Sequence, residues 1–181
     1  MEDYTRGEQE FLLKTARRVL TEYLSNGTRQ QPQTVNQNLW EKRGVFVTIL
    51  KNGKLRGCIG HLEMDQSLIA SVSEMSIAVA HDPRFPPLEF SELEDIEIEI
   101  SILTEKIKTS FEEIKSGDGV LLVSGDKTAT FLPQVWQDLK NKKEFMASLC
   151  QKADLDNECY LDASTEFYVY QALVFREDTN D

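Results

Sequence analysis

A chain of 181 residues, 40% of them hydrophobic, is long enough to bury one core or to divide into two lobes that share an interface. Acidic residues outnumber basic ones by 31 to 20, and the net charge of −11 would repel a phosphate backbone, so we expect no nucleic-acid partner. No apolar run approaches the roughly 18 residues that span a bilayer, and residues 1–4 lack the features of a signal peptide, which predicts a cytoplasmic protein without a membrane partner.

The chain begins with the pattern of a capped helix. Thr5 and Glu8 have the spacing of a capping box, in which a hydroxyl and a carboxylate bind the first free amides of a helix. Apolar residues then recur at helical spacing, and Asn26-Gly27 is expected to end the helix.

A hairpin and a second helix are predicted next. Residues 45–50 and 54–60 flank Asn52-Gly53, the strongest short signal for a hairpin turn. Asp65 is then expected to cap a helix over residues 66–79. The later predicted elements are a half-buried strand over 96–102, a short helix over 111–114, a hairpin of 119–124 and 127–132, helices over 134–139 and 143–153, and a final strand over 166–175.

These elements predict an α+β fold of two lobes, built on mostly antiparallel sheets with flanking helices. The lobes are expected over approximately residues 1–104 and 105–181. Each hairpin is followed by a helix and a strand, so the chain is either a duplicated β-β-α-β unit or two occurrences of a common motif.

The cysteine count agrees with a reducing compartment. Cys58, Cys150 and Cys159 form neither an even disulfide framework nor a Cys-x-x-Cys pair. We therefore expect all three to be thiols.

The densest chemistry of the chain lies in the sequence LRGCIGH at residues 55–61. With a two-residue turn, Val47 would lie opposite Cys58 and Ile49 opposite Arg56, and alternation would place Arg56 on the same strand face as the thiol. A nearby cation stabilises the thiolate, which is the reactive form of cysteine. Cys58 is therefore a candidate catalytic nucleophile with Arg56 as its cation.

The two glycines of this motif fit either a site or a packed strand. Gly57 and Gly60 would let a substrate or another segment of backbone approach closely, which makes them candidates for ligand binding. The alternative is that Cys58 is a small buried hydrophobe and that the glycines mark a bulge or tight packing.

The second unusual stretch is HDPRFPP at residues 81–87, whose three prolines forbid a regular helix. We predict that it packs beside the strand of Cys58 and forms one wall of a cleft with it. His81 would then be the general base for the thiol, and Asp82 or a neighbouring carbonyl would orient the imidazole.

Arg84 and Phe85 are candidates for ligand binding in the same stretch. Arg84, held among prolines, would present its guanidinium to a carboxylate or phosphate. The alternative is a structural bridge from Arg84 to Asp82 or Glu89.

A metal site is the weaker interpretation of the histidines. His61 follows Cys58 at a Cys-x-x-His spacing, and His81 would be a third ligand for zinc. Two histidines and one nearby cysteine are few, and the interpretation in which His61 simply ends a strand at the surface is favoured over a metal site. We therefore predict no bound metal and no cofactor.

The motif at residues 55–60, LRGCIG, is the signature of the AMME critical-region protein family, the AMMECR domain, and the chain resembles this family from its first helix to its last strand. DPRFPP at 82–87, EIS at 99–101 and FLPQV at 131–135 are similar to the family's other fixed points, in the same order. The resemblance implies an intracellular α+β protein of two lobes without a settled activity. It also implies genomic company with Memo-like and radical-SAM proteins, and hence a shared pathway or modification system.

The sequence departs from the family pattern at two positions. Asp154 stands where the family tends to have glycine, and Cys159 stands where it usually has tryptophan. Both lie outside the candidate site, so they affect local packing more than function.

Two classes of function fit these residues. In the first, the protein is an enzyme that uses Cys58 in acyl or group transfer, or to modify a protein or a small metabolite. In the second, it is a non-catalytic module that binds a partner protein and regulates or scaffolds it. An enzyme needs an accessible, activated thiol, whereas a binding module tolerates an inert one. The small molecule, the protein partner and the oligomeric state are not identified by the sequence.

Overall fold

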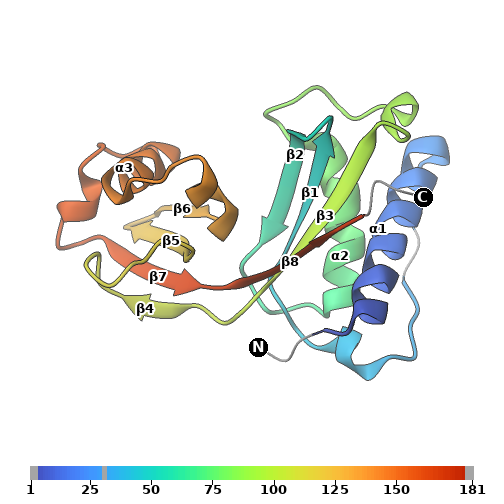
Figure 1. The fold of residues 1–181 in the computed structure, drawn as a ribbon, viewed down its shortest axis with the longest axis horizontal. Coiled ribbons are helices and arrows are strands. Elements are labelled where there is room, and N and C mark those ends of the chain that lie inside the picture. Colours follow the sequence, from blue (N-terminus) through green and yellow to red (C-terminus); the bar gives the residue numbers. More distant parts are fainter. Residues whose placement is uncertain (1–3, 30–31, 178–181) are drawn as a thin grey trace. The chain divides into compact units, whose positions relative to one another are not determined.

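The computed structural model describes residues 4–29 and 32–177. The chain forms two compact units: residues 1–103 and 173–181 belong to the first unit, and residues 104–172 to the second (Figure 1). The division falls near residue 104, and the described residues 173–177 return to the first unit. Each unit combines helix with a four-stranded sheet, which confirms the predicted α+β class.

The first unit packs two helices against one face of its sheet (Figure 1). Fully buried Ile98 and Ile100 of the sheet pack in one core with Leu12 and Leu68 of the helices. The strands have the spatial order β2-β1-β3-β8. The elements are α1 (Arg6–Asn26), β1 (Val45–Lys51), β2 (Lys54–His61), α2 (Leu68–Ala78), β3 (Ile96–Leu103) and β8 (Ala172–Arg176).

Helix α1 begins and ends where the sequence predicts. The Thr5 hydroxyl accepts a hydrogen bond from the Glu8 amide, the Glu8 carboxylate accepts one from the Thr5 amide at 2.7 Å, and Gly27 ends the helix in a left-handed conformation. Glu8 is buried and also accepts hydrogen bonds from the amides of Asn36 and Asn38. The hydrogen bonds from Thr5, helped by those from the two asparagines, lower the pKa of Glu8 to about 2.

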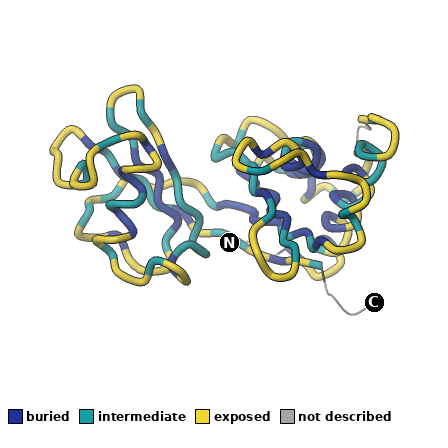
Figure 2. The backbone as a smooth tube through the Cα atoms, turned by 90° about the horizontal axis from the view of Figure 1, so that it is seen from above, coloured by how far each residue is buried: buried dark blue, intermediate teal, exposed yellow. Residues whose placement is uncertain are grey.

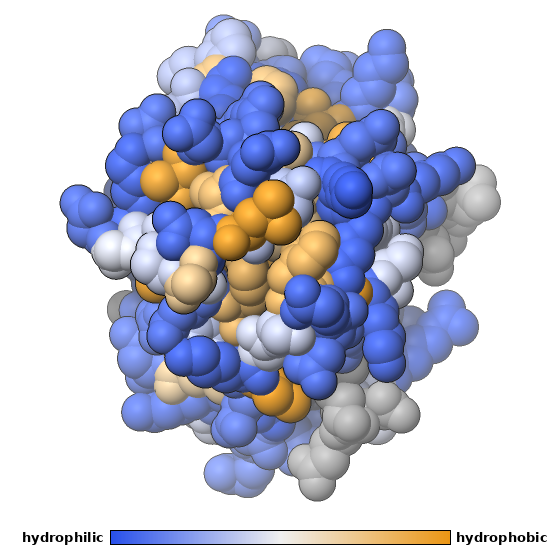
Figure 3. Space-filling model, turned by 90° about the vertical axis from the view of Figure 1, so that its left-hand side faces the viewer, coloured by the Kyte–Doolittle hydropathy of each residue, from blue (hydrophilic) through white to orange (hydrophobic). Residues whose placement is uncertain are grey.

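The second unit has a smaller core around one helix. Its sheet has the order β4-β7-β5-β6, and the Trp136 and Phe145 rings stack in its core with centroids 3.9 Å apart. In both units the buried residues follow the strands and helices, and the exposed residues follow the connections (Figure 2). The surface of the second unit in Figure 3 is mostly hydrophilic around a central group of apolar side chains. The elements are β4 (Ile107–Thr109), β5 (Gly119–Ser124), β6 (Lys127–Phe131), α3 (Lys142–Lys152) and β7 (Glu166–Tyr170).

Short 3-10 helices connect several of these elements. They are η1 (Gln37–Trp40), η2 (Val79–His81), η3 (Phe90–Glu92), η4 (Pro133–Gln137) and η5 (Cys159–Leu161).

Among the described residues, none of the helices is long and apolar enough to cross a membrane.

Several predicted boundaries differ from the structure. The N-cap of α2 is Ser67 instead of Asp65, because Gln66 lies in a bend and Ser67 forms an isolated β-bridge with Lys42 before the helix begins at Leu68. Residues 111–114 form turns only, and η4 replaces the helix expected over 134–139. The predicted last strand is two strands, β7 and β8, which belong to different sheets.

The two sheets have the same connectivity. In each, the first hairpin strand lies between the second hairpin strand and the strand that follows the helix: β2-β1-β3 in the first unit and β6-β5-β7 in the second. The fourth strand is exchanged, because β4 follows β3 in the chain but pairs with β7, and β8 follows β7 but pairs with β3. This shared order agrees with a duplicated unit whose last strands have crossed over.

The expectation of three thiols is wrong for two of the cysteines. Cys150 and Cys159 form a disulfide with Cα atoms 5.9 Å apart. Helix α3 ends just after Cys150, and Asp154 adopts a left-handed φ of 56°, which turns the chain back so that Cys159 reaches the helix. The Cα distance lies in the usual range for a disulfide, and no spacing rule for short motifs would have indicated the pair.

Reducing the disulfide should destabilise the second unit. It closes a loop of nine residues, so chain-entropy arguments give a loss of about 2–3 kcal/mol in the free energy of unfolding. We expect that loss in denaturant titrations of a Trp40→Phe background, in which Trp136 fluorescence reports on the second unit. A reductant should have no further effect on Cys159→Ser, and an unchanged midpoint in the reduced parent protein would contradict the pairing.

Candidate active site

The strand of Cys58 lies at one edge of the first sheet, and its register differs from the predicted one. Asn52 and Gly53 form the expected turn with φ values of 52° and 71°. A bulge then shifts the pairing, because Ile49 lies opposite Gly57 whereas Leu50 lies opposite Leu55. Cys58 therefore faces Thr48, not Val47.

Arg56 is the extra residue of this bulge, and its charge is directed to another partner. Its Nε and Nη2 atoms donate to the two carboxylate oxygens of Glu92 at 3.1 and 2.8 Å, and Lys51 binds the same carboxylate at 3.1 Å. The hydrogen bonds from Arg56 lower the pKa of Glu92 to about 2, although burial opposes the shift. Arg56 therefore ties the hairpin to η3, which is a different contact from the expected role as the cation of Cys58.

The proline-rich loop binds the free edge of β2 at Cys58. The Asp82 carboxylate accepts a hydrogen bond from the Cys58 amide at 2.9 Å, and Arg84 Nη2 donates to the Cys58 carbonyl at 3.1 Å. These backbone groups point away from β1, so side chains satisfy an edge that would otherwise be open. The prediction that the loop packs beside the Cys58 strand is confirmed, whereas the expected cleft stays a prediction.

Asp82 and Arg84 also bind each other. Arg84 donates from Nε and from its own amide to Asp82 Oδ1 at 3.0 Å, and from Nη2 to Oδ2 at 2.6 Å. Asp82 is only 3% exposed, and burial alone would raise the pKa of its carboxyl, but the hydrogen bonds from Arg84 and the Cys58 amide outweigh burial and lower that pKa to about 2. The structure thus favours the bridge to Asp82 that was one alternative for Arg84, although half of the Arg84 side chain is still exposed.

The thiol of Cys58 is half-buried and lies in a polar environment. The Thr48 hydroxyl donates to Cys58 Sγ at 3.3 Å. The Arg84 guanidinium is paired with Asp82, whose hydrogen bond raises the pKa of Arg84 most, and a smaller electrostatic interaction with Cys58 raises it further. A hydroxyl donor and a guanidinium are both groups that stabilise a thiolate.

The two histidines have other described partners. His81 is exposed, and its Nε2 atom lies 2.8 Å from the Tyr23 hydroxyl of α1. His61 lies 2.8 Å from the Glu63 carbonyl through Nδ1 and 3.2 Å from the Ser71 hydroxyl through Nε2. The role of His81 as a base for Cys58 stays a prediction. Within residues 4–29 and 32–177, no three His, Cys, Asp or Glu side chains are grouped as metal ligands.

The glycines of the motif are explained by contacts within the protein. A Cβ atom on Gly57 would lie 3.0 Å from the Val79 carbonyl oxygen, so Gly57 allows η2 to approach β2. A Cβ atom on Gly60 would lie 2.2 Å from the Val45 carbonyl oxygen and 2.4 Å from the Phe46 ring. Of the two alternatives weighed for these residues, tight packing is the one with observed contacts.

Sequence reasoning missed Thr48, Glu92 and Tyr23. Each contacts a residue that the motifs singled out, and two of them, Glu92 and Tyr23, come from distant parts of the chain. Thr48 alone had a usable signal, because it sits in the hairpin one residue from the position assigned opposite Cys58. The Phe85 ring centroid lies 5.6 Å from the Arg84 guanidinium carbon, and the role of Phe85 in ligand binding stays a prediction.

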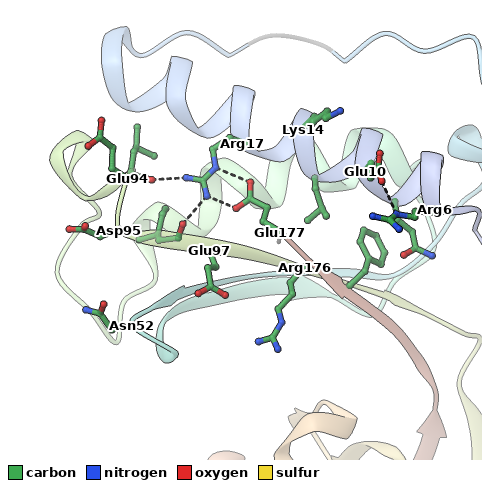
Figure 4. Close-up of a pocket in the computed structure, with 15 residues that line it drawn as sticks. Arg6, Glu10, Lys14, Arg17, Asn52, Glu94, Asp95, Glu97, Arg176 and Glu177 are labelled. Atoms are coloured by element: carbon green, nitrogen blue, oxygen red, sulfur yellow. Dashed lines mark hydrogen bonds and ion pairs between the residues drawn. The ribbon is translucent and has the colours of Figure 1, made fainter. Parts of the chain in front are cut away.

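The first unit also carries a polar groove of about 1180 Å³ outside this site, between α1 and the segments before β3 and at the end of β8 (Figure 4). Arg17 occupies its centre and donates to Glu177 and to the carbonyls of Leu93 and Ile96. These contacts join α1 to the segments at the start of β3 and the end of β8, so the charge of Arg17 stabilises the fold of the first unit.

The fold and the motif together define an α+β protein of two four-stranded sheets, in which the polar contacts of the candidate site lie at the edge strand β2 of the first sheet. The AMMECR1 family model matches residues 13–175, and the chain therefore belongs to the AMMECR1 family. A protein of Thermococcus onnurineus is 40% identical over 93% of this chain and 90% of its own length, and Protein PF1979 of Pyrococcus furiosus is 39% identical over 93% and 88%. The crystal structure of an uncharacterised protein, PH0010 of Pyrococcus horikoshii, matches with a TM-score of 0.89 and 35% identity, covering 93% of this chain and 91% of that one.

Alanine at the two motif glycines should destabilise the protein to different extents. Gly60→Ala must displace backbone and an aromatic ring, so we expect a loss of about 3 kcal/mol in the free energy of unfolding, against about 1 kcal/mol for Gly57→Ala. Gly7→Ala is the matched control, since its Cβ atom meets open space in a helix and should leave stability unchanged or slightly higher. Equal stability of the Gly60 and Gly7 variants in denaturant titrations would contradict the packing explanation.

Asp82 should contribute to acid sensitivity. Its folded pKa of about 2 lies below the unfolded value, so its contribution of about 2 kcal/mol is present above pH 4 and is lost as the pH falls towards 2. Asp82→Asn should therefore lower the free energy of unfolding at pH 7 and weaken its dependence on pH between pH 4 and 2. Glu8 and Glu92 should still contribute to that dependence. Asp126→Asn, in the exposed turn between β5 and β6, is the control. An Asp82 variant with the pH slope of the parent protein would contradict this assignment.

Proposed function

We propose that this protein is a cysteine-dependent group-transfer enzyme in which Cys58 is the nucleophile. The observation that carries the proposal is the half-buried thiol, which accepts a hydrogen bond from Thr48 and interacts with the charge of Arg84. Both contacts favour the thiolate, which is the attacking species. In this proposal Arg84 is the cation that stabilises the thiolate, a role that we predicted for Arg56 from the sequence.

The chemistry that suits this arrangement is acyl transfer. The Cys58 thiolate bonds to the carbonyl carbon of an activated acyl donor, and the bond from that carbon to the leaving group breaks. The leaving group departs with the electron pair and takes up a proton equivalent to the one lost by the thiol. Water or an acceptor amine then attacks the thioester, and the thiolate is regenerated.

A second function, a non-catalytic interaction module, is favoured by the way the motif is packed. Asp82 and Arg84 satisfy the edge of β2, and the protein's own atoms fill the space at both motif glycines. A motif used in this way holds a rigid surface without any reaction at Cys58. The two functions differ in the behaviour of the thiol.

Alkylation of the native protein separates these functions. The enzyme proposal expects iodoacetamide to modify one thiol per chain without denaturant, because the other two cysteines are paired, and Cys58→Ser to abolish the reaction. Arg84→Gln should slow alkylation at neutral pH by about three- to tenfold, and Arg84→Lys, which keeps the charge, should recover most of the rate.

Arg56→Gln is the matched comparison, since its guanidinium is bound to Glu92, and its effect should be smaller than that of Arg84→Gln. Circular dichroism of each variant checks that the fold is retained. A Cys58 that reacts only after denaturant is added would overturn the enzyme proposal and leave the interaction module as the better one.

A further inference from the structure

We infer that Thr48 is a positioning residue for the Cys58 thiolate and that Glu99 is the charge that opposes its formation, an inference that rests on the proposed role of Cys58. The three residues form one row across the first sheet. Thr48 on β1 pairs with Cys58 on β2 and with Glu99 on β3. Directly paired residues project from the same face of a sheet, so the three side chains share one face.

That face is opposite the one covered by the helices. The helix-facing positions of β1 are Val47 and Ile49, which are almost fully buried in the core with α1 and α2. Thr48 lies between them in the sequence and projects to the other side, yet it is only 6% exposed. Its hydroxyl is thus a buried polar group, and the acceptor it is given is the sulfur atom of Cys58 at 3.3 Å.

A buried hydroxyl with sulfur as its acceptor favours the charged form of the thiol. A neutral thiol is a weak acceptor, whereas a thiolate gains a charge-assisted hydrogen bond. Thr48 is β-branched and held in a central strand, so its hydroxyl can keep this orientation at little additional entropic cost. Arg84 and Asp82 of the loop are charged groups beside Cys58. At the other end of the row, Glu97 of β3 projects from the same face as Glu99, and Arg176 of the neighbouring strand β8 lies across from Glu99.

Glu99 acts in the opposite direction from two strands away. Neighbouring strands lie about 4.8 Å apart, which puts Glu99 roughly 10 Å from Cys58 along the row. At that separation a partly screened like charge still disfavours the thiolate. The row therefore combines a donor next to the thiol with a carboxylate beyond it, and the balance between them sets the ionisation of Cys58.

The inference predicts shifts of opposite sign in one measurement. Thiolate formation at Cys58 is followed as the ultraviolet absorbance difference between each protein and its Cys58→Ser counterpart over a pH titration. Thr48→Val removes the donor while keeping the shape, and should raise the titration midpoint by about half to one pH unit. Thr48→Ser restores a hydroxyl and should return the midpoint towards the parent value. Glu99→Gln should lower it by about half a unit.

Thr130→Val is the matched control, because that hydroxyl donates to the Val120 carbonyl in the other sheet and the substitution should leave the midpoint unchanged. An unshifted midpoint in a folded Thr48→Val protein would overturn the inference, and so would a Glu99→Gln shift of the same sign. If Thr48→Val does not fold, Thr48→Ala, which also removes the hydroxyl, takes its place, and an unshifted midpoint in that variant would equally overturn the inference.

Alkylation rates of the same variants keep this result separate from the proposed function. If Thr48→Val shifts the midpoint but native Cys58 does not react with iodoacetamide, the positioning role stands and the enzyme proposal fails. If Cys58 reacts and Thr48→Val leaves both midpoint and rate unchanged, the enzyme proposal stands and Thr48 is structural. The expected result is a slower rate at neutral pH for Thr48→Val that converges with the parent rate at high pH, where the thiol is fully ionised.

Discussion

The carboxylate of Asp82 is the group on which the rest of the site depends. It binds the Cys58 amide on one side and the Arg84 guanidinium on the other, and it is almost completely buried. A buried anion is stable only with such partners, because an unpaired charge in that place would cost several kcal/mol. The same contacts fix the loop against β2, set the position of Arg84 relative to the thiol and satisfy the edge of the sheet. Gly57 favours this arrangement, since a Cβ atom there would lie 3.0 Å from the Val79 carbonyl oxygen and would push η2 slightly away from the strand.

Most elements of the fold could be predicted because their signals are local. The capping box of Thr5 and Glu8, the Asn52-Gly53 turn and the alternating isoleucines of β3 each act within a few residues, and each appears where expected. The candidate site could be proposed for the same reason, since the prolines of residues 83–87 restrict the backbone and the glycines beside Cys58 allow close approach, and both are visible in the sequence. The predictions that were wrong concern contacts that the local sequence pattern does not determine. The bulge at Arg56 has no local signature, and its one-residue shift replaced an apolar neighbour of Cys58 with Thr48. Likewise, Glu92 could not be assigned to Arg56 from spacing, because the two are joined only through the folded loop.

The shared connectivity of the two sheets shows what is specific to the first. Counting pairs back from each hairpin turn, the Thr48 and Cys58 pair corresponds to Leu121 and Thr130 in the second unit. Leu121 is buried and apolar, and its partner on β7 is Tyr168, in the place that Glu99 holds on β3. The second hairpin also lacks an irregularity in its register. The second sheet therefore repeats the scaffold without the thiol, the donor or the carboxylate, which is the pattern expected when one copy of a scaffold carries the chemistry and the other does not.

The two departures from the family pattern fall in the copy without that chemistry. Asp154 has a left-handed φ of 56°, a conformation that glycine adopts at no steric cost, so the family's preference for glycine there has a backbone reason. Aspartate is one of the few other residues that tolerate this conformation, and here Lys127 binds both its carbonyl and its carboxylate. Cys159, where the resemblance implies tryptophan, forms a covalent bond to Cys150 in the core of the same unit. Both residues thus contribute to the turn after α3. They lie outside the row of Thr48, Cys58 and Glu99, because that row belongs to the sheet of the first unit.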